Sequence, residues 1–226
     1  MKMRFLYFYS PFYQFYHEHI QSTLSTHFEL ESILIEDIQE KENKNLHHFE
    51  GLTIKLDLII AAIKRYMGEI IVFSDATIFI NANKAHELQA YLLENPHLDI
   101  VFVNESRNGQ NIGVLRITCS EKTLDFFEKS LQIMKDGVET HDQNAIKRVL
   151  SNEPDIESGY FGDRIMCQYF YEHLREHFYI FKSFISNRGK ESNFNQRLQQ
   201  FYDHRLIDEA TYNKWSIRNE TNQIIW

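Results

Sequence analysis

Short apolar runs alternate along the chain with longer segments in which apolar residues recur every three or four positions. The runs are rich in β-branched and aromatic residues, as buried strands are, whereas the longer spacing is typical of helices that pack one face on a core. The polar stretch 37–48 is predicted to be a loop. The pattern predicts strands at residues 4–9, 28–35, 70–73, 98–104 and 112–117, and helices at 11–24, 49–67, 84–95, 124–134, 142–150 and 195–215.

This alternation of strands and helices predicts an α/β fold with a mainly parallel central sheet, helices on both of its faces and a helical C-terminal segment. The 226 residues, 43% of them hydrophobic, suit a single domain over 1–226, because three prolines and eight glycines leave no linker-like segment. In such sheets ligands bind at the carboxyl ends of the strands. Polar residues that follow a predicted strand are therefore the first candidates for a site.

The charge pattern restricts the possible partners. A net charge of -8 with scattered basic residues argues against a nucleic-acid-binding face. Cys119 and Cys167 lack Cys-x-x-Cys spacing, which suits a reducing compartment, and no window has the length of apolar sequence that a membrane span needs. We therefore expect a soluble cytoplasmic protein without a transmembrane segment, and the tail 222–226 could serve a homodimer or a membrane-bound acceptor.

One acidic residue directly follows a strand that should be buried. In "FSDATIF", residues 73–79, Asp75 ends the apolar run, and in an extended segment Asp75 and Thr77 would project to one side while Ala76 and Ile78 turn toward the core. A metal ion that holds a diphosphate is one partner for such a carboxylate. The alternative is that Asp75 caps the next turn.

Three segments together resemble the nucleotide-diphospho-sugar glycosyltransferases of the GT-A fold. "FSDATIF", "QNIGVLRI" and "HDQNAIKRVL" stand in the order of that group's SDxD strand, its NxG motif and the DQ that opens a helix. The likeness is good over 55–150, adequate for the N-terminal strand and helix, and fades after Leu150. It implies a single GT-A-like (Rossmann-like) domain with a nucleotide-sugar-binding core at 1–150 and an acceptor-side or lid segment at 151–226.

The resemblance also implies an activity and a set of site residues. The activity is transfer of a hexosyl or pentosyl group from a nucleotide-diphosphate sugar, with UDP-sugar as the expected donor, to a glycan or other hydroxyl acceptor. The residues implied are Asp142 and Gln143 beside the transferred sugar; Ser10, Lys55, Ser74, Asp75, Asn111 and Gly113 at the donor; and Asp75, Thr77 and His204 at a metal ion.

The metal is the weakest part of this correspondence. Thr77 stands where the second Asp of the DxD motif belongs, and a neutral hydroxyl is a poorer ligand for a hard cation than a carboxylate. Mn²⁺ or Mg²⁺ is therefore expected either to arrive with the donor diphosphate or to be dispensable. The resembled group mostly retains anomeric configuration; if this enzyme instead inverts, Asp142 is the candidate base.

Each candidate residue also has a structural interpretation. Asn111 could occupy a turn, since Asn108-Gly109 just before it is a hairpin signal. Asp142 and Gln143 could be first-turn residues favoured by the helix dipole, and Lys55 could be a solvated helix lysine.

Other functions have weaker sequence support. "HLREH", residues 173–177, fits an inverted zinc-peptidase motif with His173 and His177 as ligands and Glu176 as base, although 167–181 also reads as a helix that leads into a strand. A haloacid-dehalogenase-type phosphatase would want a second acid two residues after Asp75. A catalytically degenerate domain that binds a glycan or a partner stays open because of Thr77.

Overall fold

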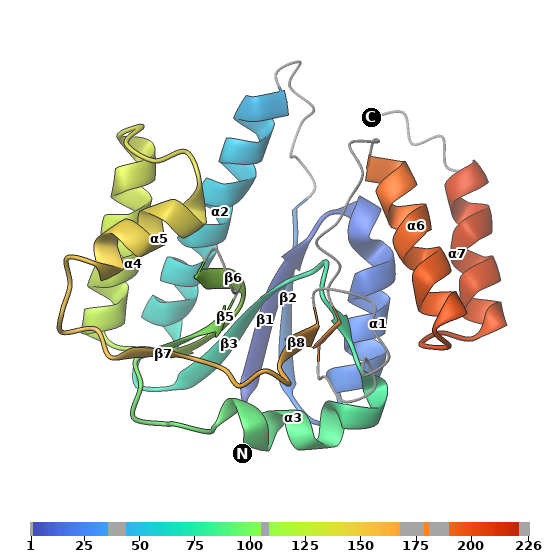
Figure 1. Ribbon diagram of the computed structural model, residues 1–226, viewed down its shortest axis with the longest axis horizontal. Coiled ribbons are helices and arrows are strands. Elements are labelled where there is room, and N and C mark those ends of the chain that lie inside the picture. The colour runs from blue at the N-terminus through green and yellow to red at the C-terminus, as the bar shows by residue number, and fades with distance from the viewer. Residues whose placement is uncertain (1, 36–43, 105–108, 168–178, 181–189, 222–226) are drawn as a thin grey trace.

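Two parallel strands, β1 (Arg4–Tyr9) and β3 (Ile70–Asp75), lie side by side in the middle of a six-stranded sheet (Figure 1). This computed structural model describes all residues except 1, 36–43, 105–108, 168–178, 181–189 and 222–226. The strand order is β2-β1-β3-β6-β5-β7. The four other strands are β2 (Glu29–Leu34), β5 (Ile100–Asn104), β6 (Gln110–Thr118) and β7 (Ser158–Tyr160).

The sheet is mostly parallel, as predicted, but β6 runs against both of its neighbours. The short connection between β5 and β6 explains this direction, since only antiparallel strands can be joined by so few residues. Gly109, at its end, has a φ of +82°, a conformation that glycine adopts without strain. The hairpin signal in the sequence is thus confirmed, whereas Asn111 belongs to β6 and not to the turn.

Helices cover both faces of the sheet, also as predicted. On one face α2 (Lys44–Arg65), α4 (Glu121–Lys135) and α5 (Asp142–Leu150) pack over a core that includes Ile59, Phe73 and Phe127. On the other face α1 (Gln14–Leu24) and α3 (Ala85–Leu92) pack on a second core. The carboxyl ends of β1 and β3 therefore lie between two helical layers.

Several element boundaries differ from the predictions. The N-terminal helix starts as a 3₁₀ turn, η1 (Pro11–Tyr13), and Ser10 is extended but makes no capping hydrogen bond through its side chain. α2 begins at Lys44, so the loop prediction is wrong for 44–48, while most of its remainder lies outside the described residues. A separate small sheet has the order β4-β9-β8, and 3₁₀ helix η2 precedes α3; their bounds are β4 (Phe79–Ile80), β8 (Met166–Cys167), β9 (Tyr179–Ile180) and η2 (Ala82–Lys84).

The predicted C-terminal helix is two helices, α6 (Lys190–Asp203) and α7 (Glu209–Thr221). The turn between them contains Arg205, whose φ of 55° is the left-handed conformation that often ends a helix. Both helices lie beside α1 (Figure 1), joined to it by an aromatic cluster that includes Phe15, Phe201 and Trp215. None of the described helices combines the length and the apolar character that crossing a membrane requires.

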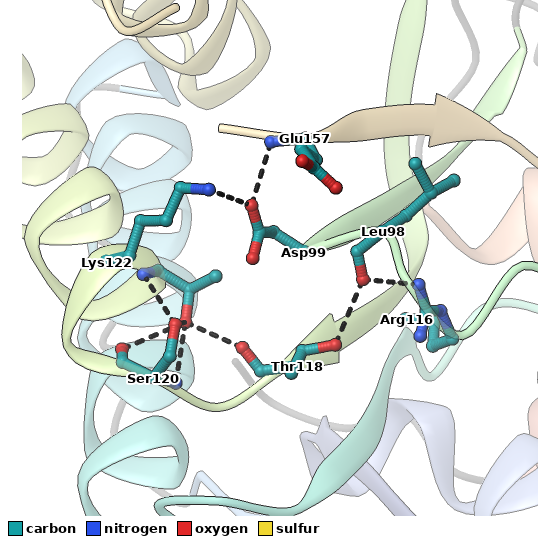
Figure 2. A network of polar contacts seen from close by, with 8 residues as sticks. Leu98, Asp99, Arg116, Thr118, Ser120, Lys122 and Glu157 are labelled. Atoms are coloured by element: carbon teal, nitrogen blue, oxygen red, sulfur yellow. Dashed lines mark hydrogen bonds and ion pairs between the residues drawn. The ribbon is translucent and has the colours of Figure 1, made fainter. Parts of the chain in front are cut away.

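A polar network fixes the sheet at the end opposite to Asp75 (Figure 2). The Leu98 carbonyl accepts hydrogen bonds from Arg116 Nη2 at 2.7 Å and Thr118 Oγ1 at 3.0 Å, and Thr118 pairs with the first residue of β3. Asp99 Oδ2 lies 2.6 Å from Lys122 Nζ at the start of α4. These contacts anchor β5, β6 and α4 to one another, which leaves the Asp75 end of the sheet available for a site.

Candidate functional site

Three charged side chains from three separate elements meet at the carboxyl end of β3. Lys55 Nζ, on α2, lies 2.7 Å from Asp75 Oδ1 and 3.8 Å from Asp142 Oδ2. The Lys55 and Asp142 side chains are 5% and 2% exposed, while that of Asp75 is 33% exposed. Lys55 is therefore not the solvated helix lysine of the structural interpretation, and Asp75 is the member of the group that solvent reaches.

The local fold explains how a lysine comes to be buried here. Lys55 precedes Leu56 and lies on the side of α2 that packs against the sheet, so its stem is covered by the core while its ammonium reaches the strand ends. A buried ammonium needs opposite charge beside it. Asp75, the last residue of β3, and Asp142, the first of α5, provide that charge.

Asp142 is held as a carboxylate by its neighbours. Its Oδ1 accepts a hydrogen bond from the Gln143 backbone N–H at 2.8 Å and lies 3.1 Å from His141 Nδ1. Burial on its own would raise the pKa of Asp142, but the contact with His141 and the charge of Lys55 hold that pKa below its usual range. Oδ2 is buried, accepts no hydrogen bond from the described residues and lies 3.8 Å from the Lys55 ammonium.

Asp75 has the opposite tendency. Burial raises the pKa of its carboxyl, the nearby charge of Lys55 opposes that rise, and the charge of Asp142 adds to it. The two carboxylates thus share one ammonium, and their protonation states are linked.

Asn111 and Gly113 form the wall of the site beside Asp75. Ser74 pairs with Val114 in the antiparallel β3–β6 ladder, so Asp75 and Gly113 come next to each other. A Cβ at Gly113 would lie 2.9 Å from Asn111 Oδ1 and 3.3 Å from Asp75 Oδ2. Asn111 Oδ1 accepts a hydrogen bond from the Gly113 N–H at 2.7 Å. The packing of Asn111 and Asp75 against the backbone therefore requires a glycine at position 113.

Beyond Asp75 the chain turns sharply. The Ile78 N–H donates to the Asp75 carbonyl at 3.3 Å, so the expected extended segment, with Asp75 and Thr77 projecting together, is wrong. Ala76 and Ile78 are buried as predicted, and Thr77 is partly exposed within the turn. Asp75 is the first residue of this turn, but among the described residues its carboxylate pairs with Lys55 and caps no backbone N–H of the turn.

The other predicted site residues are less closely connected. Ser10 lies at the same edge of the sheet, because Phe8 pairs with Asp75 in the parallel β1–β3 ladder. The Ser74 hydroxyl is buried and donates to the Asp75 carbonyl at 3.1 Å, so it faces the backbone. His204 is exposed just after α6.

The predicted metal ligands do not form a ready cation site. Across the described part of the chain, no three His, Cys, Asp or Glu residues are grouped so that they could hold a metal ion. Asp75 supplies one carboxylate, already paired with Lys55, and Thr77 supplies only a hydroxyl. This donor set does not fit a resident Mn²⁺ or Mg²⁺, which prefer several charged oxygen ligands.

Two neighbours of the site were missed from the sequence. His141 contacts Asp142 and is the residue before the DQ motif, so its position was the available signal. Arg197 on α6 is 8% exposed. Its charge and that of Asp75 both reach Tyr13, whose pKa is raised chiefly by burial. No motif or spacing in the sequence predicted that Arg197 would be a neighbour of the site.

Comparison with known proteins identifies the fold. No protein-family model and no curated protein matches the chain. Among solved structures, a glycosyltransferase involved in the glycosylation of the major capsid of PBCV-1 superimposes with a TM-score of 0.62 and 12% identity, over 82% of this chain and 96% of that one. The chain has a GT-A-like glycosyltransferase fold.

Two further structures with this fold are longer than the chain. The apo form of GlyE from Streptococcus pneumoniae TIGR4 matches with a TM-score of 0.58 and 12% identity, over 96% of this chain and 64% of that one. The bifunctional glycosyltransferase WbbM matches with 0.54 and 8%, over 82% and 46%. The GT-A-like fold predicted from the sequence is thereby confirmed. The zinc motif at 173–177 falls entirely within 168–178, outside the described residues.

Proposed function

We propose that the chain is a glycosyltransferase that moves a hexosyl or pentosyl group from a nucleotide-diphosphate sugar, with UDP-sugar as the expected donor, to a hydroxyl of a glycan or other acceptor. One observation carries the proposal: Lys55, Asp75 and Asp142 converge at the carboxyl end of a strand, and Asp142 Oδ2 is buried without a hydrogen bond. A sugar hydroxyl or a positively charged sugar carbon would satisfy that oxygen.

The roles follow from where charge develops during the reaction. Cleavage of the bond between the anomeric carbon and the diphosphate oxygen leaves negative charge on the diphosphate, which the Lys55 ammonium stabilises. The sugar gains oxocarbenium character, which the Asp142 carboxylate stabilises. The missing side chain at Gly113 lets Asn111 Oδ1 and Asp75 Oδ2 lie against the backbone at the wall of the site, where we place the donor.

The reaction that we propose retains anomeric configuration, as the group that the sequence resembles mostly does. Asp142, whose pKa is held below its usual range and whose Oδ2 lies 3.8 Å from Lys55 Nζ, then stabilises charge and does not remove the acceptor proton. In the retaining reaction the acceptor oxygen bonds to the anomeric carbon on the face that the diphosphate leaves. The acceptor proton passes to the departing diphosphate oxygen, and the nucleoside diphosphate is released.

The test is a panel of UDP- and GDP-sugars, followed by thermal shift and by release of nucleoside diphosphate. A donor at 100 times its Kd stabilises the native state by about 2.7 kcal/mol. The thermal shift therefore detects donor binding even if the enzyme does not turn over. We expect one donor class to stabilise the protein, and Asp142→Asn to keep that binding while turnover falls by about a hundredfold or more. If no nucleotide sugar binds, the proposal is rejected; if a donor binds without any hydrolysis or transfer, the degenerate binding domain is the correct function.

A further inference from the structure

The position of a resident cation in this site is taken by a side chain. Lys55 Nζ lies 2.7 Å from Asp75 Oδ1 and 3.8 Å from Asp142 Oδ2, so the ammonium sits between the two carboxylates. A divalent ion on Asp75 would have to share that carboxylate with an ammonium, and like charges at such distances repel.

The remaining ligands are also unfavourable to a metal ion. Thr77 offers a neutral hydroxyl in place of the second carboxylate. His204 is exposed just after α6 and belongs to no group of metal-ligating residues within the described ranges. Mg²⁺ is usually held by one or two carboxylates together with substrate phosphates and waters, and within the described residues the carboxylate that this site offers, Asp75, is already paired with Lys55.

We propose that this glycosyltransferase binds the diphosphate of its donor without a divalent cation, with the Lys55 ammonium as the positive charge that a metal ion would otherwise supply. The inference rests on the proposed function and specifies its cofactor requirement. Of the two possibilities that the sequence left open, a metal that arrives with the donor and a metal that is dispensable, it selects the second.

The experiment compares the affinity for UDP in EDTA and in excess MnCl₂, by isothermal titration calorimetry, in the wild type and in Thr77→Asp. For the wild type we expect the two Kd values to agree within about threefold, which is less than 1 kcal/mol. Thr77→Asp restores a second carboxylate, so we expect Mn²⁺ to tighten UDP binding to this variant by about tenfold or more, and EDTA to weaken it below the wild type.

A matched control adds the same charge away from the site. Asn83→Asp changes an exposed residue of η2 and should leave UDP binding insensitive to Mn²⁺. The thermal midpoint of each variant in EDTA shows that it is folded; if Thr77→Asp does not fold, the wild-type comparison decides alone. Wild-type binding that is tenfold or more tighter with Mn²⁺ overturns the inference and leaves the proposed function standing. Failure of UDP and of every donor to bind with or without Mn²⁺ overturns the proposed function itself, and the inference with it.

Discussion

Lys55 Nζ lies 2.7 Å from Asp75 Oδ1, and this contact is the only direct ion pair that the described chain gives to Asp75. Replacing Lys55 with Met would leave two neighbouring carboxylates without their shared counter-charge. We expect Lys55→Met to lower the free energy of unfolding at pH 7 by about 3–5 kcal/mol, measured by urea unfolding. The loss should be smaller at acid pH, where the carboxylates are protonated.

Lys64→Met is the matched control, because Lys64 lies on the same helix and forms an exposed pair with Glu128 at 2.7 Å. Exposed pairs contribute about 1 kcal/mol or less, so this variant should be nearly as stable as the wild type. Equal losses in the two variants would contradict the assignment of a buried counter-charge to Lys55.

Gly113→Ala tests the close approach at the wall of the site. The added Cβ would lie 2.9 Å from Asn111 Oδ1, so Asn111 or Asp75 has to move. We expect a loss of about 1–3 kcal/mol in stability. Donor binding, measured by thermal shift, should weaken by about tenfold.

Gly51→Ala in α2 is the control for Gly113→Ala, since no atom lies within 4 Å of its added Cβ. Alanine is the better helix former by about 1 kcal/mol, so stability should rise while donor binding stays unchanged. A Gly113→Ala protein with wild-type affinity would show that the donor does not use this wall.

His141→Phe tests how the neighbours of Asp142 set its charge. The His141 contact is one of the factors that hold the pKa of Asp142 below its usual range, so its removal should raise that pKa. Because activity requires the ionised carboxylate, the acid limb of the kcat/KM profile should then move to higher pH. The exposed His97→Phe should leave the profile in place, and an unmoved limb in His141→Phe would exclude a positioning role for this histidine.

His19 makes stability depend on pH near the turn that follows Asp75. Its Nε2 lies 2.7 Å from the Ile80 carbonyl, and its ring stacks on Phe79 at 3.8 Å. Burial lowers the pKa of His19 from 6.5 to about 4, although the hydrogen bond to Ile80 opposes this shift. Between these values the unfolded chain binds a proton that the native state excludes, so stability falls as the pH decreases, by about 3 kcal/mol in all.

His19→Gln keeps an N–H donor for Ile80 but does not titrate. The variant should lose less stability than the wild type between pH 6.5 and pH 4, measured by urea unfolding across that range. The exposed His86→Gln should follow the wild-type curve. A His19→Gln curve parallel to the wild type would show that His19 carries no buried neutral ring.

The sequence predicted the strand that ends at Asp75 and the helix that opens at Asp142 because local periodicity reports which face of an element is buried. It did not predict that Lys55 bridges the two carboxylates, because that contact depends on long-range packing of α2 against the sheet. The antiparallel direction of β6 could have been predicted from the short connection between β5 and β6, which is visible in the sequence. The turn at Thr77 overrode the extended geometry expected from the strand before it.

Because α2, β3, β6 and α5 all meet at the site, the site is expected to be completed late in refolding. α2 and β3 are consecutive along the chain, whereas Asp142 must close a longer loop that contains β5, β6 and α4, so we expect its contact with Lys55 to form later during refolding. A fluorescent nucleotide added to the refolding chain would then brighten after the helical signal has recovered. Binding of the nucleotide would thus report when the last step of folding is complete.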